Sequence, residues 1–577
     1  MITTSSELQP TDVLLAHGLL QDPGPVPLVI AVAGHRDPRP EVLPLLQRQF
    51  RQQLEQLLRE LSHTPLLMLN GLAEGIDSIA ARVFLEVVAA DQERRGAAAP
   101  HHQLVAVLPK PPDAYRLDFT DPAALEELNQ LLTCSDGVLD PDNCADLALP
   151  PTADGRPRSA DDPACYGQQG VFLVRHCYVL FGFYDGVETR LVGGTSQTVA
   201  MQKGDIHPLF LSVDEVLATK EPGVLVLQHT PRIKSGGSIE GAGRVTFWPE
   251  ATGSGHHDSV IPQSLLAMPH RLEEINRALL QPGFEPTFYV NEGRFTRLWS
   301  WADRAARLNK GRYESWCAVL VIAGLVLVLA AQLAPVAQGV WWALLLLAFV
   351  LFPRLQQGPK HEFIAKRCLA ECLTVQHLWL ALGIPDDAAD LFHTRSNSEL
   401  NWIRTVLRAV RVQLLACHTH EPLSYGHALT KARLWIDGQV DFLQKRIGDF
   451  EVLARRWQLA AMILAVAAVV VAAAQSMPGM SDVLAAWVVV LLGGFASARA
   501  YSSLMAYADT ADRYGRSLQQ FQRGQQALAS IDPSLPAGDA SKRDRERIAV
   551  EAVGREKLDE LNDWVTSQLQ REYAPGP

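Results

Sequence analysis

The sequence lacks the features that mark metal-binding and secreted domains. It has eight cysteines among 577 residues, but none form a C-x-x-C pair, and no group of cysteines and histidines has zinc-finger spacing. The opening residues MITTSSELQPTDVLL have no basic stretch followed by an apolar run, as a secretory signal peptide would have. We therefore expect no metal site, reduced thiols, and a first domain that stays in the cytosol.

Positive charge is also scarce. The chain has 52 Lys and Arg residues against 63 Asp and Glu residues, a net charge of -11, and its basic residues form no single basic face. Proteins that bind nucleic acid usually carry a basic patch or stripe. We therefore expect no nucleic-acid partner, which disfavours a DNA-handling function.

Long apolar runs are absent before about residue 298, and four follow it. They are Trp316–Ala334, Val336–Phe352, Leu459–Ala474 and Val483–Ala498. A helix that spans a membrane needs ~17–25 mostly apolar residues, so these runs predict two transmembrane hairpins, with a buried core helix as the alternative for each. The short loops inside the hairpins contain no Lys or Arg, whereas the outer flanks do. The positive-inside rule then predicts a multi-pass protein with both termini in the cytosol.

These runs set the expected domain boundaries. The segments are an N-terminal tail (1–24), a nucleotide-binding α/β domain (25–255), a connector (256–312), a first transmembrane hairpin (313–353), a cytosolic helical region (354–456), a second transmembrane hairpin (457–499) and cytosolic C-terminal helices (500–577).

Short β-type runs alternate with glycine turns and helical stretches in the first half. The runs are Leu28–Ala33, Leu66–Leu69, Leu104–Leu108 and Tyr178–Phe183. Strand, glycine turn and helix in succession are typical of a parallel sheet with crossover helices. The fold class we expect is an α/β Rossmann-like N-terminal domain followed by an all-α membrane domain with four transmembrane helices and cytosolic helical segments. Ligands of such sheets lie beyond the carboxyl ends of the strands.

Residues near these strand ends are candidates for ligand binding. Glycines let the backbone approach a phosphate, hydroxyls donate to its oxygens, cationic side chains pair with it, and carboxylates accept from ribose hydroxyls. The candidates are Gly34, His35, Arg36, Asn70, Gly71, Gly75, Asp77, Lys110, Arg116, Asp118, Asp185, Gly193, Gly194, Thr195 and Ser196. Structural alternatives are a helix cap for Asp77, a surface ion pair for Arg116 and a backbone hydrogen bond for His35.

Three of these motifs together resemble a known family. GHRD after the first strand, NGLAEGID after the second and VGGTSQTV after the fourth are similar to motifs of the SLOG domain, the Rossmann-like superfamily of Smf/DprA proteins and lonely-guy phosphoribohydrolases. The stretches Leu108–Phe119 and His229–Arg232 resemble features of bacterial SLOG proteins with membrane segments. The resemblance implies a nucleotide-derived ligand, ADP-ribose-like or a cyclic nucleotide, and no further cofactor.

The second half resembles the SLATT transmembrane effectors of bacterial conflict systems. The similar stretches are Arg367–Gln376 and Trp435–Gln439. Those effectors often have one hairpin, whereas two are expected in this chain. The resemblance places the protein in the bacterial inner membrane, in contact with its lipid. Small-residue stretches at 465–468 and 493–498 would let helices pack closely, so we expect a homo-oligomer.

Catalysis is less expected than binding. The lonely-guy pattern PGGxGTxxE places a glutamate in the phosphate loop, but this chain has Ala200 at that position. Without that carboxylate, developing positive charge on the sugar has no partner in the turn, although Asp77 or Asp185 could replace it in space. Two hypotheses follow. The first is a membrane effector of antiphage defence that permeabilises the membrane when its α/β domain binds a nucleotide signal. The second is a membrane-anchored nucleotide hydrolase or glycohydrolase.

The expected spans contain few ionisable residues. A selective ion filter usually needs rings of charged or carbonyl groups, so the first hypothesis favours a wide or nonselective pore.

Overall fold

The chain is described from a computed structural model. The described residues are 24–149, 162–189, 192–210, 223–234, 239–250, 260–281, 297–333, 338–392, 398–418, 425–476, 483–532, 534–536 and 538–570. The expected N-terminal tail (to residue 23), residues 334–337 and 477–482 of the two hairpin loops, and residues 150–161 lie outside them. The chain forms two compact units. The first comprises residues 1–288, 295–298 and 372–428, and the second comprises residues 289–294, 299–371 and 429–577.

The first unit contains a seven-stranded sheet in the order β4-β3-β2-β1-β5-β6-β7. The strands are β1 (Leu28–Gly34), β2 (Leu66–Asn70), β3 (Gln103–Val107), β4 (Gly137–Leu139), β5 (Val179–Tyr184), β6 (Val224–His229) and β7 (Val245–Trp248). Neighbouring strands pair in parallel except β6 with β7. The predicted α/β class is therefore confirmed, and β4, β6 and β7 extend the four expected strands. The strand order reverses between β1 and β5, and such a switch point is where open α/β sheets usually bind ligands.

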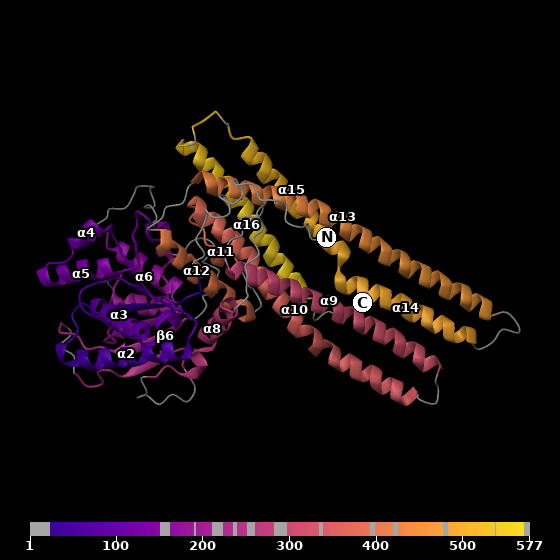
Figure 1. Cartoon of the computed structure of the whole chain (residues 1–577), viewed down its shortest axis with the longest axis horizontal. Helices are drawn as coiled ribbons and strands as arrows, with labels where there is room; N and C mark the ends of the chain where they lie inside the picture. The colour runs from indigo at the N-terminus through magenta and orange to yellow at the C-terminus, as the bar shows by residue number, and fades with distance from the viewer. Residues whose placement is uncertain are drawn as a thin grey trace. The chain divides into compact units, whose positions relative to one another are not determined.

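Helices cover the sheet in this unit (Figure 1). They are α2 (Leu43–Glu60), α3 (Ile76–Arg95), α4 (Pro112–Arg116), α5 (Pro122–Cys134), α6 (Ala164–His176), α7 (Thr195–Gln202), α8 (Ala267–Leu279), α11 (Ala388–Leu391) and α12 (Trp402–His418). Helix α3 packs beside α2 and α5, while α6 packs beside α7 and α12. Strands β1, β2 and β3 are buried along almost their whole length, as expected for a parallel sheet covered on both faces.

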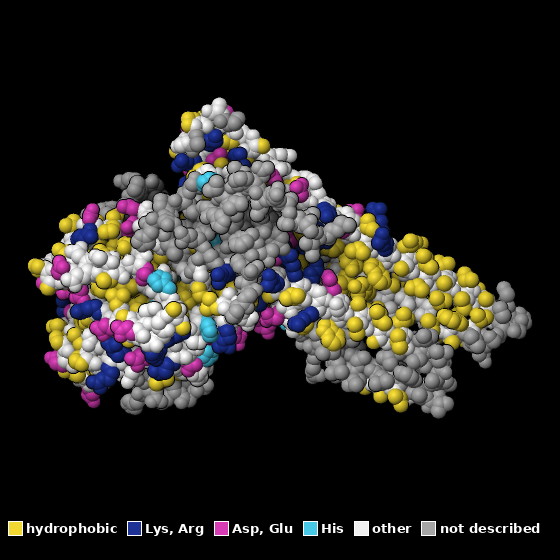
Figure 2. All heavy atoms as spheres, viewed as in Figure 1, with side chains coloured by type: hydrophobic (Ala, Val, Ile, Leu, Met, Phe, Trp, Pro, Cys, Tyr) yellow, Lys and Arg dark blue, Asp and Glu magenta, His cyan; other side chains and the backbone are white. Residues whose placement is uncertain are grey.

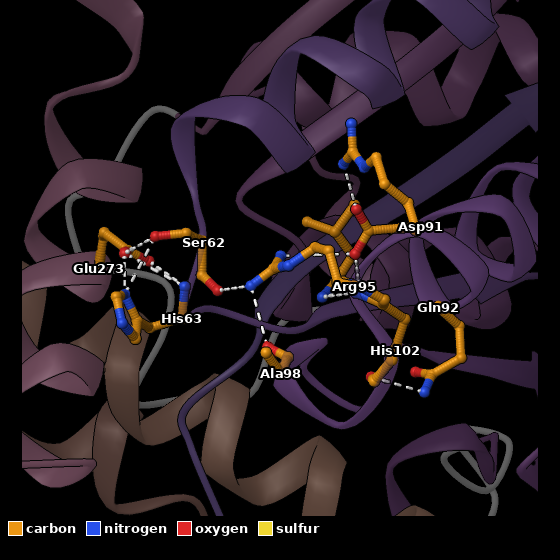
Figure 3. A network of polar contacts seen from close by, with 11 residues as sticks. Ser62, His63, Asp91, Gln92, Arg95, Ala98, His102 and Glu273 are labelled. Carbon is orange, nitrogen blue, oxygen red and sulfur yellow. Dashed lines mark hydrogen bonds and ion pairs between the residues drawn. The ribbon is translucent and has the colours of Figure 1, made fainter.

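A polar network fixes α8 at the amino edge of the sheet (Figure 3). The buried Glu273 carboxylate of α8 accepts hydrogen bonds from the backbone N–H of His63 (2.9 Å) and the hydroxyls of Ser62 (3.0 Å) and Thr64 (2.9 Å), just before β2. Burial alone would raise the pKa of Glu273, but these hydrogen bonds outweigh it and leave the pKa lowered. This edge is therefore occupied by structural contacts, which leaves the carboxyl edge for a ligand.

Helix α12 belongs to the first unit, although the sequence placed residues 354–456 in one helical region. Its Arg411 side chain donates to both carboxylate oxygens of Asp146 (3.0 Å each) and to the carbonyl oxygen of Pro385 (2.8 Å). The Cα of Ala416 approaches Gly137 of β4 so closely that a Cβ there would lie 3.1 Å from it. A segment distant in sequence thus completes the packing of the α/β unit.

The second unit is helical. Its helices are α9 (Arg297–Leu333), α10 (Gln338–Leu382), α13 (Tyr425–Gln475), α14 (Val483–Met505), α15 (Tyr507–Ala529) and α16 (Ala540–Gln570), of which α9, α10 and α13 also give residues to the first unit. Aromatic pairs join α13 to α14 and α15 in antiparallel order: Trp435 with Phe521 (5.3 Å), Phe442 with Tyr514 (6.3 Å) and Trp457 with Tyr501 (4.9 Å between ring centroids). The continuous helix expected past the last span is interrupted at Ala506, which has a left-handed backbone (φ 48°).

Two of the described helices are long and apolar enough to cross a membrane, whereas the sequence predicted four. They are Tyr425–Gln475 and Leu484–Ala529, the second of which includes the break at Ala506. The most apolar 18-residue windows of these two stretches have mean hydropathies of 2.3 and 1.5. Only 11% and 6% of their apolar windows are buried, so they are not core helices of a soluble domain. Figure 2 shows hydrophobic side chains gathered over the apolar parts of α13 and α14. Helices α9 and α10 run through the other two predicted spans, but many of their side chains there lie outside the described residues.

Candidate ligand-binding site

The first two glycine turns meet at the carboxyl edge of β1 and β2. Gly75 has a left-handed backbone (φ +92°), and a Cβ at this position would overlap the carbonyl group of Arg36. The backbone N–H of Ile76 donates to the carbonyl of His35 (3.1 Å), which ties the start of α3 to the end of β1. Only glycine permits this approach, so the two turns form one surface.

Asp77 lies between these turns. Its carboxylate accepts a hydrogen bond from the backbone N–H of Gly34 (3.1 Å), while the Asn70 side chain donates to the Asp77 carbonyl (3.0 Å). Burial raises the pKa of Asp77 to about 7, against the opposing charge of Arg36 and the hydrogen bond from Gly34. The carboxyl therefore changes charge near neutral pH, which is unusual for an aspartate and frequent at functional sites.

Asn70 and Gly71 shape the second turn from within. The side-chain oxygen of Asn70, which is fully buried, accepts from the N–H of Leu72 (2.7 Å), and Leu72 has a left-handed backbone (φ 51°). The buried Tyr115 hydroxyl donates to the Gly71 carbonyl (3.0 Å). These contacts make Asn70 a residue that holds the turn rather than one that reaches into the site.

His35 joins β1 to β5 across the switch point. Its Nε2 accepts the backbone N–H of Asp185 (3.2 Å) and lies 3.3 Å from the Asp185 carboxylate. Burial, assisted by the charge of Arg232, lowers the pKa of His35 although Asp185 opposes the shift. Nε2 can accept this hydrogen bond because the imidazole is neutral. His35 therefore makes the backbone hydrogen bond that was considered from the sequence as the alternative to ligand binding.

Two cations converge on the ring of Tyr166, which lies in α6. The Arg36 guanidinium is 5.8 Å from the ring centroid, and the Lys110 ammonium is 5.5 Å from it. Lys110 also pairs with Asp118 (2.9 Å), and the Tyr166 hydroxyl donates to the other oxygen of that carboxylate. Burial, followed by the hydrogen bond to Asp118, raises the pKa of Tyr166, so its phenol stays protonated. The group therefore holds two positive charges around one aromatic ring and one carboxylate.

The third glycine turn lies against the same tyrosine. Gly193 has a left-handed backbone (φ +79°), and a Cβ there would overlap the backbone and Cβ of Tyr166. Gly194 is the N-cap of α7 and has no side chain with which to cap the helix. The Ser196 hydroxyl lies 3.3 Å from the Tyr184 hydroxyl and from the backbone N–H of Thr189. Thr195 is the first residue of α7, so the start of this helix lies next to the Arg36, Lys110 and Tyr166 group. The N–H groups of Gln197 and Thr198 bond to the Gly194 carbonyl (2.9 and 3.1 Å), and among the described residues those of Thr195 and Ser196 have no acceptor within the helix.

Arg116 is the one candidate whose side chain lies away from the glycine turns. Its guanidinium pairs with the exposed Asp113 (2.7 Å) and donates to the Asn129 side chain (3.0 Å). This is the surface ion pair considered from the sequence. The other fourteen candidates lie in or beside the turns at the carboxyl edge of β1, β2, β3 and β5.

Sequence reasoning missed the tyrosines that join the turns. Tyr115 and Tyr166 lie outside every glycine motif, and Tyr166 follows an Asp- and Pro-rich stretch that carries no strand or helix pattern. Their role depends on contacts with Gly71, Asp118 and Gly193, which are 44, 48 and 27 positions away in sequence. No local signal predicts such contacts.

The chemistry available at this edge is that of an anion site. It offers a helix start, two cations and an aromatic ring, and Asp77 is the carboxyl whose pKa is displaced toward neutrality. Within the described ranges, no group of three or more His, Cys, Asp or Glu side chains could hold a metal ion.

The sequence was compared with protein-family models and with curated proteins. No protein-family model matches the chain, and no curated protein matches it significantly.

Proposed function

We propose that the protein is a nucleotide-sensing membrane effector. Its α/β unit binds a phosphate-bearing nucleotide signal, ADP-ribose-like or cyclic, and the bound state permeabilises the membrane during antiphage defence. The observation that carries the proposal is the convergence of Arg36, Lys110 and the α7 start around Tyr166, at the switch point of the sheet. A phosphate would pair with the cations and accept from the helix N–H groups, while the ring offers a face to the ligand's base.

The membrane part of the proposal has four spanning helices. Besides α13 and α14, helices α9 and α10 would form the first hairpin, with both termini in the cytosol and several copies of the chain assembling into a pore in a bacterial inner membrane. The basic flanks of the hairpins, and loops that contain no Lys or Arg, support this orientation. As part of the proposal, the α/β unit is a SLOG-like sensor and the helical unit a SLATT-like effector.

Ligand binding would act by shifting an equilibrium between resting and permeable states. The ligand must bind the permeable state more tightly, and a change from mostly closed to mostly open needs a preference of about 10⁴-fold.

A substitution at the α7 N-cap tests the sensor. Gly194 has an ordinary backbone conformation (φ -81°, ψ 163°), and aspartate is a favoured N-cap residue, so Gly194→Asp keeps the helix while placing a carboxylate where phosphate would bind. Gly194→Asn caps the helix equally well without the charge. We expect membrane-potential dyes to report depolarisation after phage challenge in cells that express the native chain or Gly194→Asn, and none with Gly194→Asp. Equal depolarisation with both variants would contradict the sensor site.

A second function, a membrane-anchored nucleotide hydrolase or glycohydrolase, is favoured by one observation. The pKa of Asp77, raised to about 7 by burial, suits a general acid or base at neutral pH. Incubation of the full chain with NAD and ADP-ribose distinguishes the two functions. Steady product release that disappears in Asp77→Asn would establish the enzyme. The same product release, without depolarisation of the membrane in any condition, would establish it as well.

A further inference from the structure

The helical unit contains a large cavity that the proposed function does not use. Its volume is about 470 Å³, within the range of small-molecule sites, and five helices line it: α9, α10, α13, α15 and α16, together with the end of α14. Every lining residue belongs to the second unit.

The cavity walls carry more positive than negative side chains. The basic ones are Arg307, Lys310, Arg367, Arg446, Arg513 and Lys557, and the acidic ones are Asp303, Glu314, Glu371 and Glu560. Six against four leaves an excess of two positive charges. A concave surface with one excess sign and apolar walls attracts ligands of the opposite sign.

Most of the acidic groups are already engaged between cations. Asp303 lies between Arg307 and Arg367, Glu371 between Arg367 and Lys557, and Glu560 between Lys557 (2.9 Å) and Arg513 (3.7 Å). Each of these three carboxylates bridges two basic side chains. This alternating chain holds the helices together and still carries one more cation than anions.

The other two cations are better placed to meet a ligand. Lys310 and Arg446 are about half exposed, at 47% and 49%, and their nearest carboxylates, Glu314 and Asp449, are 3.8 Å and 3.6 Å away and equally exposed. Although about half of the Lys310 side chain is exposed, the enclosure of the rest, together with the charges of Arg446 and Arg367, lowers its pKa, and Glu314 opposes the shift. Cations crowd at this rim, and a bound anion would relieve their repulsion.

Aromatic side chains form another part of the wall. Phe450 lies 5.8 Å from Tyr514 and 6.1 Å from Tyr507, and Phe363 lies 5.6 Å from Trp564 between ring centroids. Such a wall accommodates the less polar body of an anionic molecule while the rim holds its charge.

The lining residues flank the expected membrane spans. Tyr313 precedes the first apolar run by three positions, Phe450 precedes the third by nine, and Leu504 follows the fourth by six. Basic and aromatic residues at these positions are typical of the cytosolic membrane interface, where anionic phospholipid headgroups are concentrated.

We propose that this cavity is a second ligand site, which binds the phosphate group of an anionic molecule through Lys310 and Arg446 and its apolar body through the aromatic wall. The phosphate comes from a lipid headgroup or from a soluble phosphate compound, and the chemistry of recognition is the same. The site does not depend on what the α/β unit binds.

Paired charge-neutralising variants of the full chain test the site. Lys310→Gln with Arg446→Gln removes the two rim cations, and Arg312→Gln with Arg455→Gln removes two exposed cations from the same helices outside the cavity. In neutral detergent, thermal unfolding is titrated with phosphatidylglycerol, phosphatidylcholine, inorganic phosphate and ADP-ribose. We expect phosphatidylglycerol, but not phosphatidylcholine, to stabilise the native chain. The rim pair should weaken its apparent affinity by about thirtyfold, the contribution usual for two basic side chains, while the control pair changes it by less than about threefold.

The titrations with the soluble ligands, inorganic phosphate and ADP-ribose, distinguish the two sources of phosphate. A shift with ADP-ribose or inorganic phosphate that is lost in the rim pair and kept in Gly194→Asp would assign a soluble phosphate compound to the cavity. A shift lost in Gly194→Asp alone belongs to the α/β site and supports nothing at the cavity. If no ligand distinguishes the rim pair from the control pair, the cavity is not a phosphate site and the proposal fails.

Discussion

Asp77 connects the glycine turns from a position where its charge is poorly hydrated. The hydrogen bond that the carboxylate accepts from the Gly34 N–H favours the ionised form. Burial favours the neutral form more strongly, and the pKa of Asp77 rises to about 7. In an unfolded chain the same carboxyl would have the ordinary value of 3.8. Folding therefore takes up a proton between these two pH values, and the stability that neutral Asp77 contributes is present below 3.8 and lost as the pH rises through about 7.

Replacement of Asp77 by asparagine should remove this dependence. Asn keeps an oxygen for the Gly34 N–H but has no charge to bury. Relative to the native chain, Asp77→Asn should gain up to about 1.4 kcal/mol of unfolding free energy per pH unit between pH 4 and 7. Thermal unfolding of the full chain across this range measures the gain. Asp113→Asn, at a fully exposed carboxylate, is the control. Parallel curves for the native chain and Asp77→Asn would show that Asp77 titrates normally.

Helix α12 is held to the α/β unit by a buried ion pair. Arg411 is 3% exposed and Asp146 is 11% exposed, and the guanidinium also donates to the carbonyls of Pro385 and Asp386. Burial alone would raise the pKa of Asp146, but the Arg411 charge, together with the His176 imidazole 3.8 Å away, holds it below its usual value. Loss of one partner of a buried ion pair strongly lowers the stability of the fold, because the other charge stays buried without a partner.

Arg411→Met should therefore destabilise the α/β unit by about 3–5 kcal/mol, measured as the unfolding of the full chain in detergent. Arg411→Met combined with Asp146→Leu replaces this pair by apolar groups and should recover part of the loss, since the buried Asp387 carboxylate, 3.9 Å from Arg411, still loses its cation. Equal destabilisation by the single and double variants would mean that shape, not charge, holds α12 in place.

At the scale of the whole molecule, the proposed hairpins would determine how the chain meets a membrane. Helices α13 and α14 qualify as spans, and the proposed topology adds α9 and α10 with both loops facing outward. Exposed positions at the tips of the hairpins, Gly339 and Ser476, and an exposed position after α15, Ser534, can report on this arrangement.

Single cysteines at these positions provide the measurement. A membrane-impermeant maleimide should label Gly339→Cys and Ser476→Cys in intact spheroplasts, and Ser534→Cys only after permeabilisation. The native chain, whose exposed Cys134 lies in the α/β unit, is the background control. Labelling of Ser476→Cys but not of Gly339→Cys would leave two spans instead of four.

The sequence by itself determined the class of each half of the chain. Alternation of strand and helix patterns predicted the α/β sheet, because period and turn residues are local properties. Apolar runs predicted α13 and α14 as candidate spans, since composition over about twenty residues decides whether a helix suits a membrane. The glycine motifs also predicted which strand ends carry the candidate site.

Only the tertiary structure decided how those ends are joined. It placed Tyr166 between Arg36 and Lys110, turned Arg116 toward Asp113, and assigned α12 to the α/β unit. It also brought basic and acidic residues from four helices into one alternating chain around the cavity of the helical unit. These contacts join residues far apart in sequence, and each depends on burial and packing, which no local pattern of residues encodes.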